Sequence, residues 1–108
     1  MMKFDTLDFI KSCIQLRKIR WTYHVNMRLK GRFISREAVL SSIDKYEIIE
    51  EYPEDKYLPS VLIYTTYQGE IIHIQIATDY KNNYITIVTT YRPDSFKWEK
   101  DFKTRRKS

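Results

Sequence analysis

Apolar residues in the first part of the chain recur every three or four positions, which is the period of an α-helix. Three stripes of this kind predict three helices, and their apolar positions are Leu7, Ile10 and Ile14; Trp21, Val25 and Leu29; and Ala38, Val39 and Ile43. Asp5 or Thr6 can cap the first helix and Ser35 the third, because their side-chain oxygens accept hydrogen bonds from free backbone amides of the first turn. Gly31 offers a left-handed end to the second helix, which we expect over about residues 22–30.

Runs of β-branched and aromatic residues, separated by turn residues, begin at residue 46 and predict strands. The four runs cover residues 46–52, 60–67, 70–79 and 84–92. Gly69 and Asn82 or Asn83 can adopt positive φ in the tight turns between the last three strands. Beyond the last strand, Asp94 is expected to cap a short C-terminal helix that ends near residue 102. The pattern predicts an α+β fold in which two or three N-terminal helices pack on a four-stranded antiparallel sheet.

Alternation within the last two strands assigns side chains to the two faces of the sheet. The isoleucines of these strands share one face, and they are Ile72, Ile74, Ile76, Ile85 and Ile87. A register shift of one residue would move one set into water, so the pairing that buries both is strongly preferred. The same pairing puts His73 and Gln75 on the other face with Thr86, Thr90 and Arg92. We expect helices to cover the isoleucine face and the polar face to remain open to a ligand.

Charges are unevenly distributed along the chain, whose 108 residues fit a single domain. Residues 1–36 hold nine Lys and Arg against two Asp, residues 37–93 hold four against nine acidic residues, and residues 94–108 hold six against three. The net charge of +5 favours an acidic partner such as nucleic acid. If the two basic ends meet, they form one phosphate-binding surface. The alternative is a basic helix and a frayed tail, and we expect residues 103–108 to be mobile.

Several functional classes lack their sequence motif. Cys13 is the only cysteine, so no disulfide can form within the chain, which suits the reducing cytoplasm. No apolar run approaches the roughly 18 residues that a membrane-spanning helix needs, and residues 1–13 are too charged for a signal peptide. Phosphate-binding glycine loops, nucleophile elbows and zinc-protease motifs do not occur in the sequence. The acidic residues of 47–55 lack histidine or cysteine neighbours, so we assign them to a solvated strand edge and expect no metal and no cofactor.

Two groups of basic side chains are candidates for a site. His24, Arg28 and Arg32 follow one another at intervals of four residues, and the first two lie at one border of the second predicted helix. His73 and Arg92 are expected on the open face of the sheet. Each has a structural alternative: an amphipathic helix edge for His24 and Arg28, a hydrogen-bonded core residue for His73, and a solvated strand-end cation for Arg92.

Four segments occur in a characteristic order: HVNMRLKGRFISREAVLSSI, EIIEEYPED, IIHIQIATD and TIVTTYRPD. With these motifs, from about residue 23 to residue 93, the chain resembles the bacterial family called domain of unknown function 4258. That family is similar in layout to the BrnT and RelE-like toxins, which are small basic ribonucleases encoded beside an antitoxin. The resemblance places the family's motif positions on His24, Arg28, Arg32, His73 and Tyr91. The basic tail beyond Lys97 is not part of the shared pattern.

The resemblance implies metal-independent cleavage of RNA, which needs a proton-transfer group and cations that stabilise the phosphate. The expected catalytic residues are His24, Arg28 and His73, and the expected substrate-binding residues are Arg32, Tyr91, Arg92 and Lys97. Either histidine can transfer the proton, because its ordinary pKa lies close to neutral pH. RNA and a small acidic antitoxin protein are the expected partners, in the cytoplasm.

Two alternatives to cleavage stay open. In the first, the same basic face binds nucleic acid or an acidic protein without catalysis, since arginine charge alone supplies affinity. In the second, the His-x3-Arg-x3-Arg motif is purely structural, and His24 and Arg28 bond to acidic strand residues such as Glu50 or Glu51.

Overall fold

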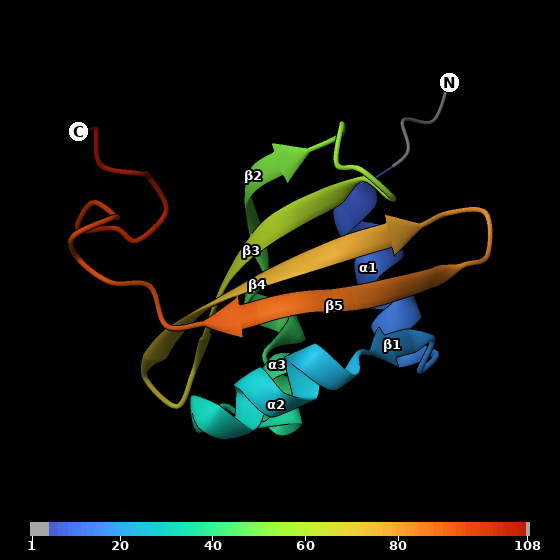
Figure 1. Cartoon of the computed structure of the whole chain (residues 1–108), viewed down its shortest axis with the longest axis horizontal. Helices are drawn as coiled ribbons and strands as arrows, with labels where there is room; N and C mark the ends of the chain where they lie inside the picture. The colour runs from blue at the N-terminus through green and yellow to red at the C-terminus, as the bar shows by residue number, and fades with distance from the viewer. Residues whose placement is uncertain (1–4, 108) are drawn as a thin grey trace.

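The computed structural model describes residues 5–107, which form three α-helices, a short 3-10 helix and one five-stranded sheet (Figure 1). The helices are α1 (Thr6–Gln15), α2 (Tyr23–Gly31), α3 (Arg36–Ser41) and the 3-10 helix η1 (Ile43–Lys45). The strands are β1 (Ile19–Trp21), β2 (Glu47–Tyr52), β3 (Ser60–Tyr67), β4 (Glu70–Asp79) and β5 (Tyr84–Tyr91). Within the described residues, no helix is both long and apolar enough to cross a membrane.

The sheet is mixed, with the strand order β1-β5-β4-β3-β2. Neighbours pair antiparallel except for β1, which runs parallel to β5. The α+β class and the four long strands are confirmed. The prediction of a four-stranded, purely antiparallel sheet is wrong, because β1 adds a fifth strand that is parallel to its neighbour. Residues 19–21 are too short to show an alternating pattern, and only their pairing with the edge of β5 makes them a strand.

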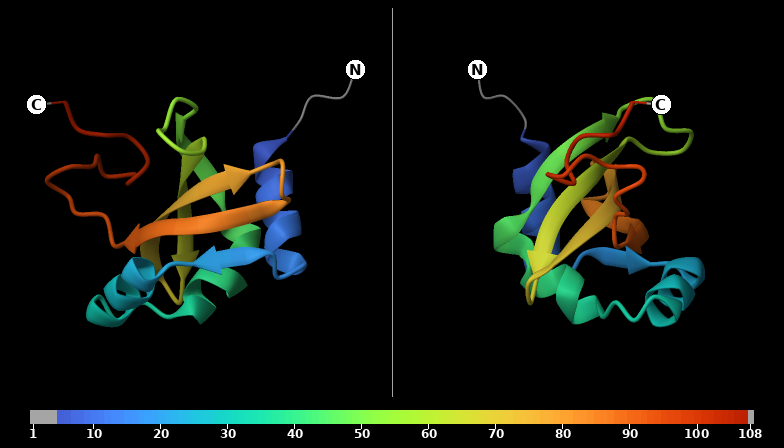
Figure 2. Two further views of the ribbon diagram at one scale, coloured as in Figure 1. Left: turned by 45° about the vertical axis from the view of Figure 1, so that its right-hand side comes forward. Right: turned by 90° about the vertical axis from the view of Figure 1, so that its left-hand side faces the viewer.

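Helices cover one side of the sheet, as predicted. The isoleucines of β4 and β5 are buried there against Ile10, Cys13 and Ile14 of α1. Two views agree that α1 and the C-terminal segment lie on opposite sides of the sheet (Figure 2). The polar face is therefore not open along its whole length, because the segment after β5 covers part of it.

A β-bulge changes which residues of β5 face the helices. Gln75 pairs with Thr89 but the next residue of β4 pairs with Ile87, so Val88 is an extra residue in β5. Beyond this bulge the alternation is inverted: Thr90 is buried on the core side, and Tyr91 pairs with His73. The prediction that Thr90 and Arg92 share a face with His73 is therefore wrong, because it extended the alternation of Ile85 and Ile87 through the bulge.

Helix ends follow the predicted caps with one exception. The side chains of Asp5 and Ser35 accept hydrogen bonds from the first turns of α1 and α3, and Thr22 does the same for α2. The predicted left-handed end at Gly31 is wrong, since this residue is the last one of α2 and Phe33 takes the positive φ of 55° instead. In the turns between strands, Gly69 and Asn83 have positive φ, as predicted.

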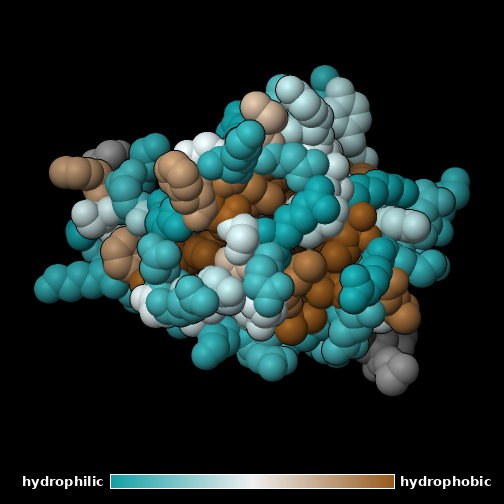
Figure 3. Space-filling model, turned by 90° about the horizontal axis from the view of Figure 1, so that it is seen from below, coloured by the Kyte–Doolittle hydropathy of each residue, from teal (hydrophilic) through white to brown (hydrophobic). Residues whose placement is uncertain are grey.

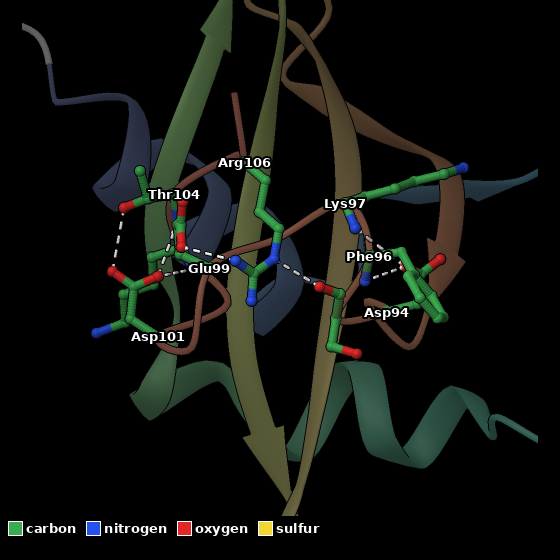
Figure 4. Close-up of polar contacts among 9 residues, drawn as sticks. Asp94, Phe96, Lys97, Glu99, Asp101, Thr104 and Arg106 are labelled. Atoms are coloured by element: carbon green, nitrogen blue, oxygen red, sulfur yellow. Dashed lines mark hydrogen bonds and ion pairs between the residues drawn. The ribbon is translucent and has the colours of Figure 1, made fainter. Parts of the chain in front are cut away.

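The segment after β5 contains turns where a short C-terminal helix was predicted, so that prediction is wrong. The Asp94 carboxylate accepts hydrogen bonds from the next free amides, but the chain then reverses, and Trp98 pairs with Arg105 through the backbone. Arg106 donates to the Ser95 carbonyl and to Glu99, which closes the reversal (Figure 4). The Trp98 side chain is only 2% exposed, and its burial stabilises this folded-back conformation relative to a solvent-exposed helix.

Candidate functional site

An open pocket of about 710 Å³ lies where the C-terminal end of α2, the end of β5 and the C-terminal segment meet. Its lining residues are Gly31, Arg32, Phe33, Tyr91, Arg92, Asp94, Lys97, Trp98 and Arg105. Four of these side chains are cations and one is a carboxylate. We refer to this hollow as the cationic pocket. It gathers all four predicted substrate-binding residues, which are Arg32, Tyr91, Arg92 and Lys97.

The two arginines on the α2 side of the pocket also tie α2 to β5. The Arg32 guanidinium donates to the Thr90 carbonyl at 2.6 Å and to the Thr89 hydroxyl at 3.3 Å. Arg92 donates back to the backbone carbonyl of Arg32 at 2.6 Å and to that of Phe33 at 3.2 Å. Its Nε also pairs with Glu70 at 3.0 Å. Arg92 therefore shapes the pocket wall, and part of its charge is already compensated.

The cations contributed by the C-terminal segment differ in how they are held. Arg105 pairs with Glu50 at 2.7 Å, and its guanidinium lies over the ring of Trp98. Hydrogen bonds to Glu50 and Tyr52 raise the pKa of Arg105, so it is charged at every physiological pH. The Lys97 side chain extends away from the contacts of the Asp94 turn (Figure 4). Its ammonium has no ion pair within residues 5–107, which leaves it available to an anion.

His73 is completely buried beneath the C-terminal segment. Its Nε2 lies 2.7 Å from the Phe102 carbonyl and its Nδ1 lies 3.3 Å from the Tyr91 hydroxyl. Since a carbonyl only accepts, Nε2 donates, and the Tyr91 hydroxyl can donate to the unprotonated Nδ1. The ring of Trp98 stands edge-on at 4.5 Å. This setting favours the structural alternative for His73, a hydrogen-bonded residue of the core.

The burial of His73 makes a pH dependence of stability predictable. Burial lowers the pKa of His73, so the unfolded chain binds this proton more readily than the folded chain. The free energy of unfolding should be independent of this group above the unfolded pKa of about 6.5 and should decrease as the pH falls below it. Urea unfolding between neutral and acidic pH should show this decrease in the wild type and a weaker one in His73→Gln. His24→Gln, which changes an exposed histidine, is the matched control; an equal weakening there would contradict the assignment.

His24 and Arg28 lie on the exposed side of α2. Residues four apart on a helix are rotated by about 40° relative to each other, so His24, Arg28 and Arg32 do not point in one direction. Of the three, Arg32 is the one that lines the pocket. Eight residues span about 12 Å along a helix axis, and Arg32 lies just past the last residue of α2, so His24 lies about two turns from the pocket. The face seen from below, to which α2 and α3 belong, also carries hydrophobic patches between hydrophilic side chains (Figure 3). The structure thus brings neither His24 nor Arg28 together with His73.

The pairing proposed for a purely structural motif is wrong. Glu50 bonds to Arg105 and Tyr52 and not to His24 or Arg28. Glu47 pairs with Lys103 at 3.0 Å. Two acidic side chains of β2, Glu47 and Glu50, therefore bind the basic tail. No group of three or more His, Cys, Asp or Glu in the described residues is arranged to hold a metal ion.

Comparison with protein families identifies the family to which the chain belongs. Residues 21–92, two thirds of the chain, match the model of a family described as a domain of unknown function (DUF4258). The chain belongs to this family. No curated protein and no solved structure gives a significant match. The DUF4258 match includes α2, the whole of β5 and three of the predicted substrate-binding residues, Arg32, Tyr91 and Arg92.

Part of the cationic pocket lies beyond the DUF4258 match, and sequence reasoning missed some of it. Lys97 was predicted, whereas Trp98 and Arg105 were not. Trp98 was expected in a short C-terminal helix with no assigned role, and Arg105 in a tail expected to be mobile. Contacts hold residues 103–106 against β2 and the preceding turn, while the mobility of the tail stays a prediction. The sequence did contain a signal for this packing, namely the opposite charges of the tail and the acidic strand: Lys103 pairs with Glu47 and Arg105 with Glu50.

Proposed function

We propose that this protein binds single-stranded RNA and holds its phosphates in the cationic pocket. The observation that carries the proposal is the gathering of Arg32, Arg92, Lys97 and Arg105 around one hollow that contains a single carboxylate, Asp94. Cations in a concave site attract phosphate oxygens and release counterions when they bind. A hollow with aromatic walls suits an unpaired strand, whose bases are free to stack, better than a duplex.

A second candidate is an endoribonuclease of the bacterial toxin type, which is the activity that the sequence resemblance implies. It is supported by Tyr91, which lines the cationic pocket beside the arginines and whose hydroxyl lies 3.3 Å from Nδ1 of His73. Burial raises the pKa of Tyr91, so this phenol would act as a hydrogen-bond donor or an acid, not as a base. His24 and Arg28 would contact the strand farther along α2, and His73 would orient Tyr91. In this candidate a small acidic antitoxin covers the pocket in the cytoplasm.

The salt dependence of RNA binding tests the first proposal. Fluorescence anisotropy with a labelled single-stranded oligonucleotide should show an affinity that falls steeply with salt. Lys97→Ala should weaken binding and reduce the slope of log affinity against log salt by about 1, because one phosphate contact is lost. Lys81→Ala removes the same charge from an exposed lysine in the turn at the other end of β5 and should leave the slope unchanged.

The same mixtures distinguish binding from cleavage. If the protein is an endoribonuclease, the wild type degrades the labelled strand on a denaturing gel in the presence of a chelator. Intact RNA with wild-type protein would contradict the second candidate but leave the first standing. Equal slopes for Lys97→Ala and Lys81→Ala would contradict the first.

A further inference from the structure

Phe33 occupies a backbone position that normally belongs to glycine. α2 ends in a Schellman motif, in which the Ile34 amide donates to the Leu29 carbonyl and the Phe33 amide to the Lys30 carbonyl. The residue at the centre of this motif must be left-handed, and Phe33 has a φ of 55°. Glycine takes this conformation without a steric penalty, whereas a bulky side chain does so rarely.

Nothing in the packing of Phe33 compensates for this strain. Its side chain is 89% exposed, so the ring gains almost no stability from burial. Gly31, two residues earlier, shows that the chain does use glycine in this region, but not at the left-handed position. Arg17 ends α1 in the same left-handed position, at a φ of 60°, so the backbone alone does not distinguish Phe33. What distinguishes it is the exposed apolar ring that this backbone presents beside the cationic pocket.

The backbone of Phe33 is held beside the cations of the pocket, so the position from which the ring projects is defined. The carbonyl of Phe33 accepts a hydrogen bond from Arg92, which also holds the carbonyl of Arg32. Ile34, the next residue, is buried in the core and anchors the other side. Phe33 is itself part of the lining of the cationic pocket. An aromatic surface fixed next to a phosphate site is the combination that binds single strands, because a base can stack while its phosphate pairs with a cation.

We propose that Phe33 is a stacking platform for an unpaired base of the RNA strand whose phosphate lies in the cationic pocket. This inference rests on the proposed function. It adds a contact to the base, through which the site would bind a single strand more tightly than a polyanion that carries no bases. Phe96, in the C-terminal segment, allows a comparison, because it is as exposed as Phe33, at 91%, but does not line the pocket.

The test compares a short oligouridylate with an abasic strand of the same length, since only the first can stack. The wild type should bind the oligouridylate about tenfold more tightly. Phe33→Gly should remove this difference and at the same time raise the melting temperature, because glycine relieves the left-handed strain. Phe33→Trp should retain the preference, and Phe96→Ala should behave as the wild type.

The outcomes separate this inference from the proposed function. If Phe33→Gly keeps the preference for oligouridylate, or if it weakens both strands equally, the stacking role is overturned while RNA binding stands. If the wild type binds neither strand, both proposals fail. Loss of melting temperature together with loss of binding in Phe33→Gly would show a structural role for the ring and would also overturn the inference.

Discussion

Trp98→Ala is expected to lower the free energy of unfolding by about 3 kcal/mol, which is the scale of truncating a large buried aromatic side chain. The indole is 2% exposed and stands edge-on to His73, with the Arg105 guanidinium over its ring. Its removal leaves a cavity and uncovers a buried imidazole. Urea denaturation measures the change, and loss of the indole fluorescence does not interfere when circular dichroism reports unfolding.

Phe96→Ala is the matched control for this prediction, since it truncates an aromatic residue two positions earlier that is 91% exposed. Its effect should stay within about 0.5 kcal/mol. Equal effects of the two substitutions would mean that the C-terminal segment does not pack on the sheet. Hydrogen exchange adds a direct measurement of the tail: the amides of Glu99 and Arg106, which bond to Thr104 and Lys97, should be protected in a packed segment and unprotected in a mobile one.

Arg92→Ala is expected to weaken both stability and RNA binding. The substitution removes the hydrogen bonds that join β5 to the carbonyls of Arg32 and Phe33, and it removes one cation from the pocket. Because the side chain is 38% exposed, solvent replaces part of what is lost, and we expect a decrease of about 1–2 kcal/mol in the free energy of unfolding. Denaturant titration and fluorescence anisotropy with a single-stranded oligonucleotide measure the two effects.

Glu70→Gln separates the two roles of Arg92. It removes the ion pair but leaves the guanidinium bound to the backbone carbonyls, so stability should change by less than about 1 kcal/mol. Loss of the neighbouring carboxylate should make the pocket more positive and strengthen RNA binding. Unchanged or weaker binding in Glu70→Gln would show that Arg92 serves only as a link between α2 and β5.

Local patterns predicted most of the secondary structure. The four long strands were predicted within one residue at each end, because alternation and turn residues act between neighbours in the chain, whereas β1 was not predicted. The caps Asp5 and Ser35 and the turn residue Gly69 were predicted for the same reason. The candidate site was predicted in part, because four residues that line the pocket were named in advance: Arg32, Tyr91, Arg92 and Lys97. The expected catalytic residues His24, Arg28 and His73 do not lie together, since the spacing of residues along a helix does not tell which of them lie near the sheet.

By itself, the sequence determined the order of the three helices and the four long strands, the isoleucine core face and the basic residues available to bind an anion. Tertiary structure decided three further features. Val88 is a bulge between two registers of β4 and β5, and this shift puts Thr90 on the core side and Tyr91 beside His73. Residues 94–107 folded back because Arg105 meets Glu50, 55 positions away, and because Trp98 finds a buried site. The cationic pocket exists only where these distant segments meet, and no local pattern encodes a contact between residues so far apart.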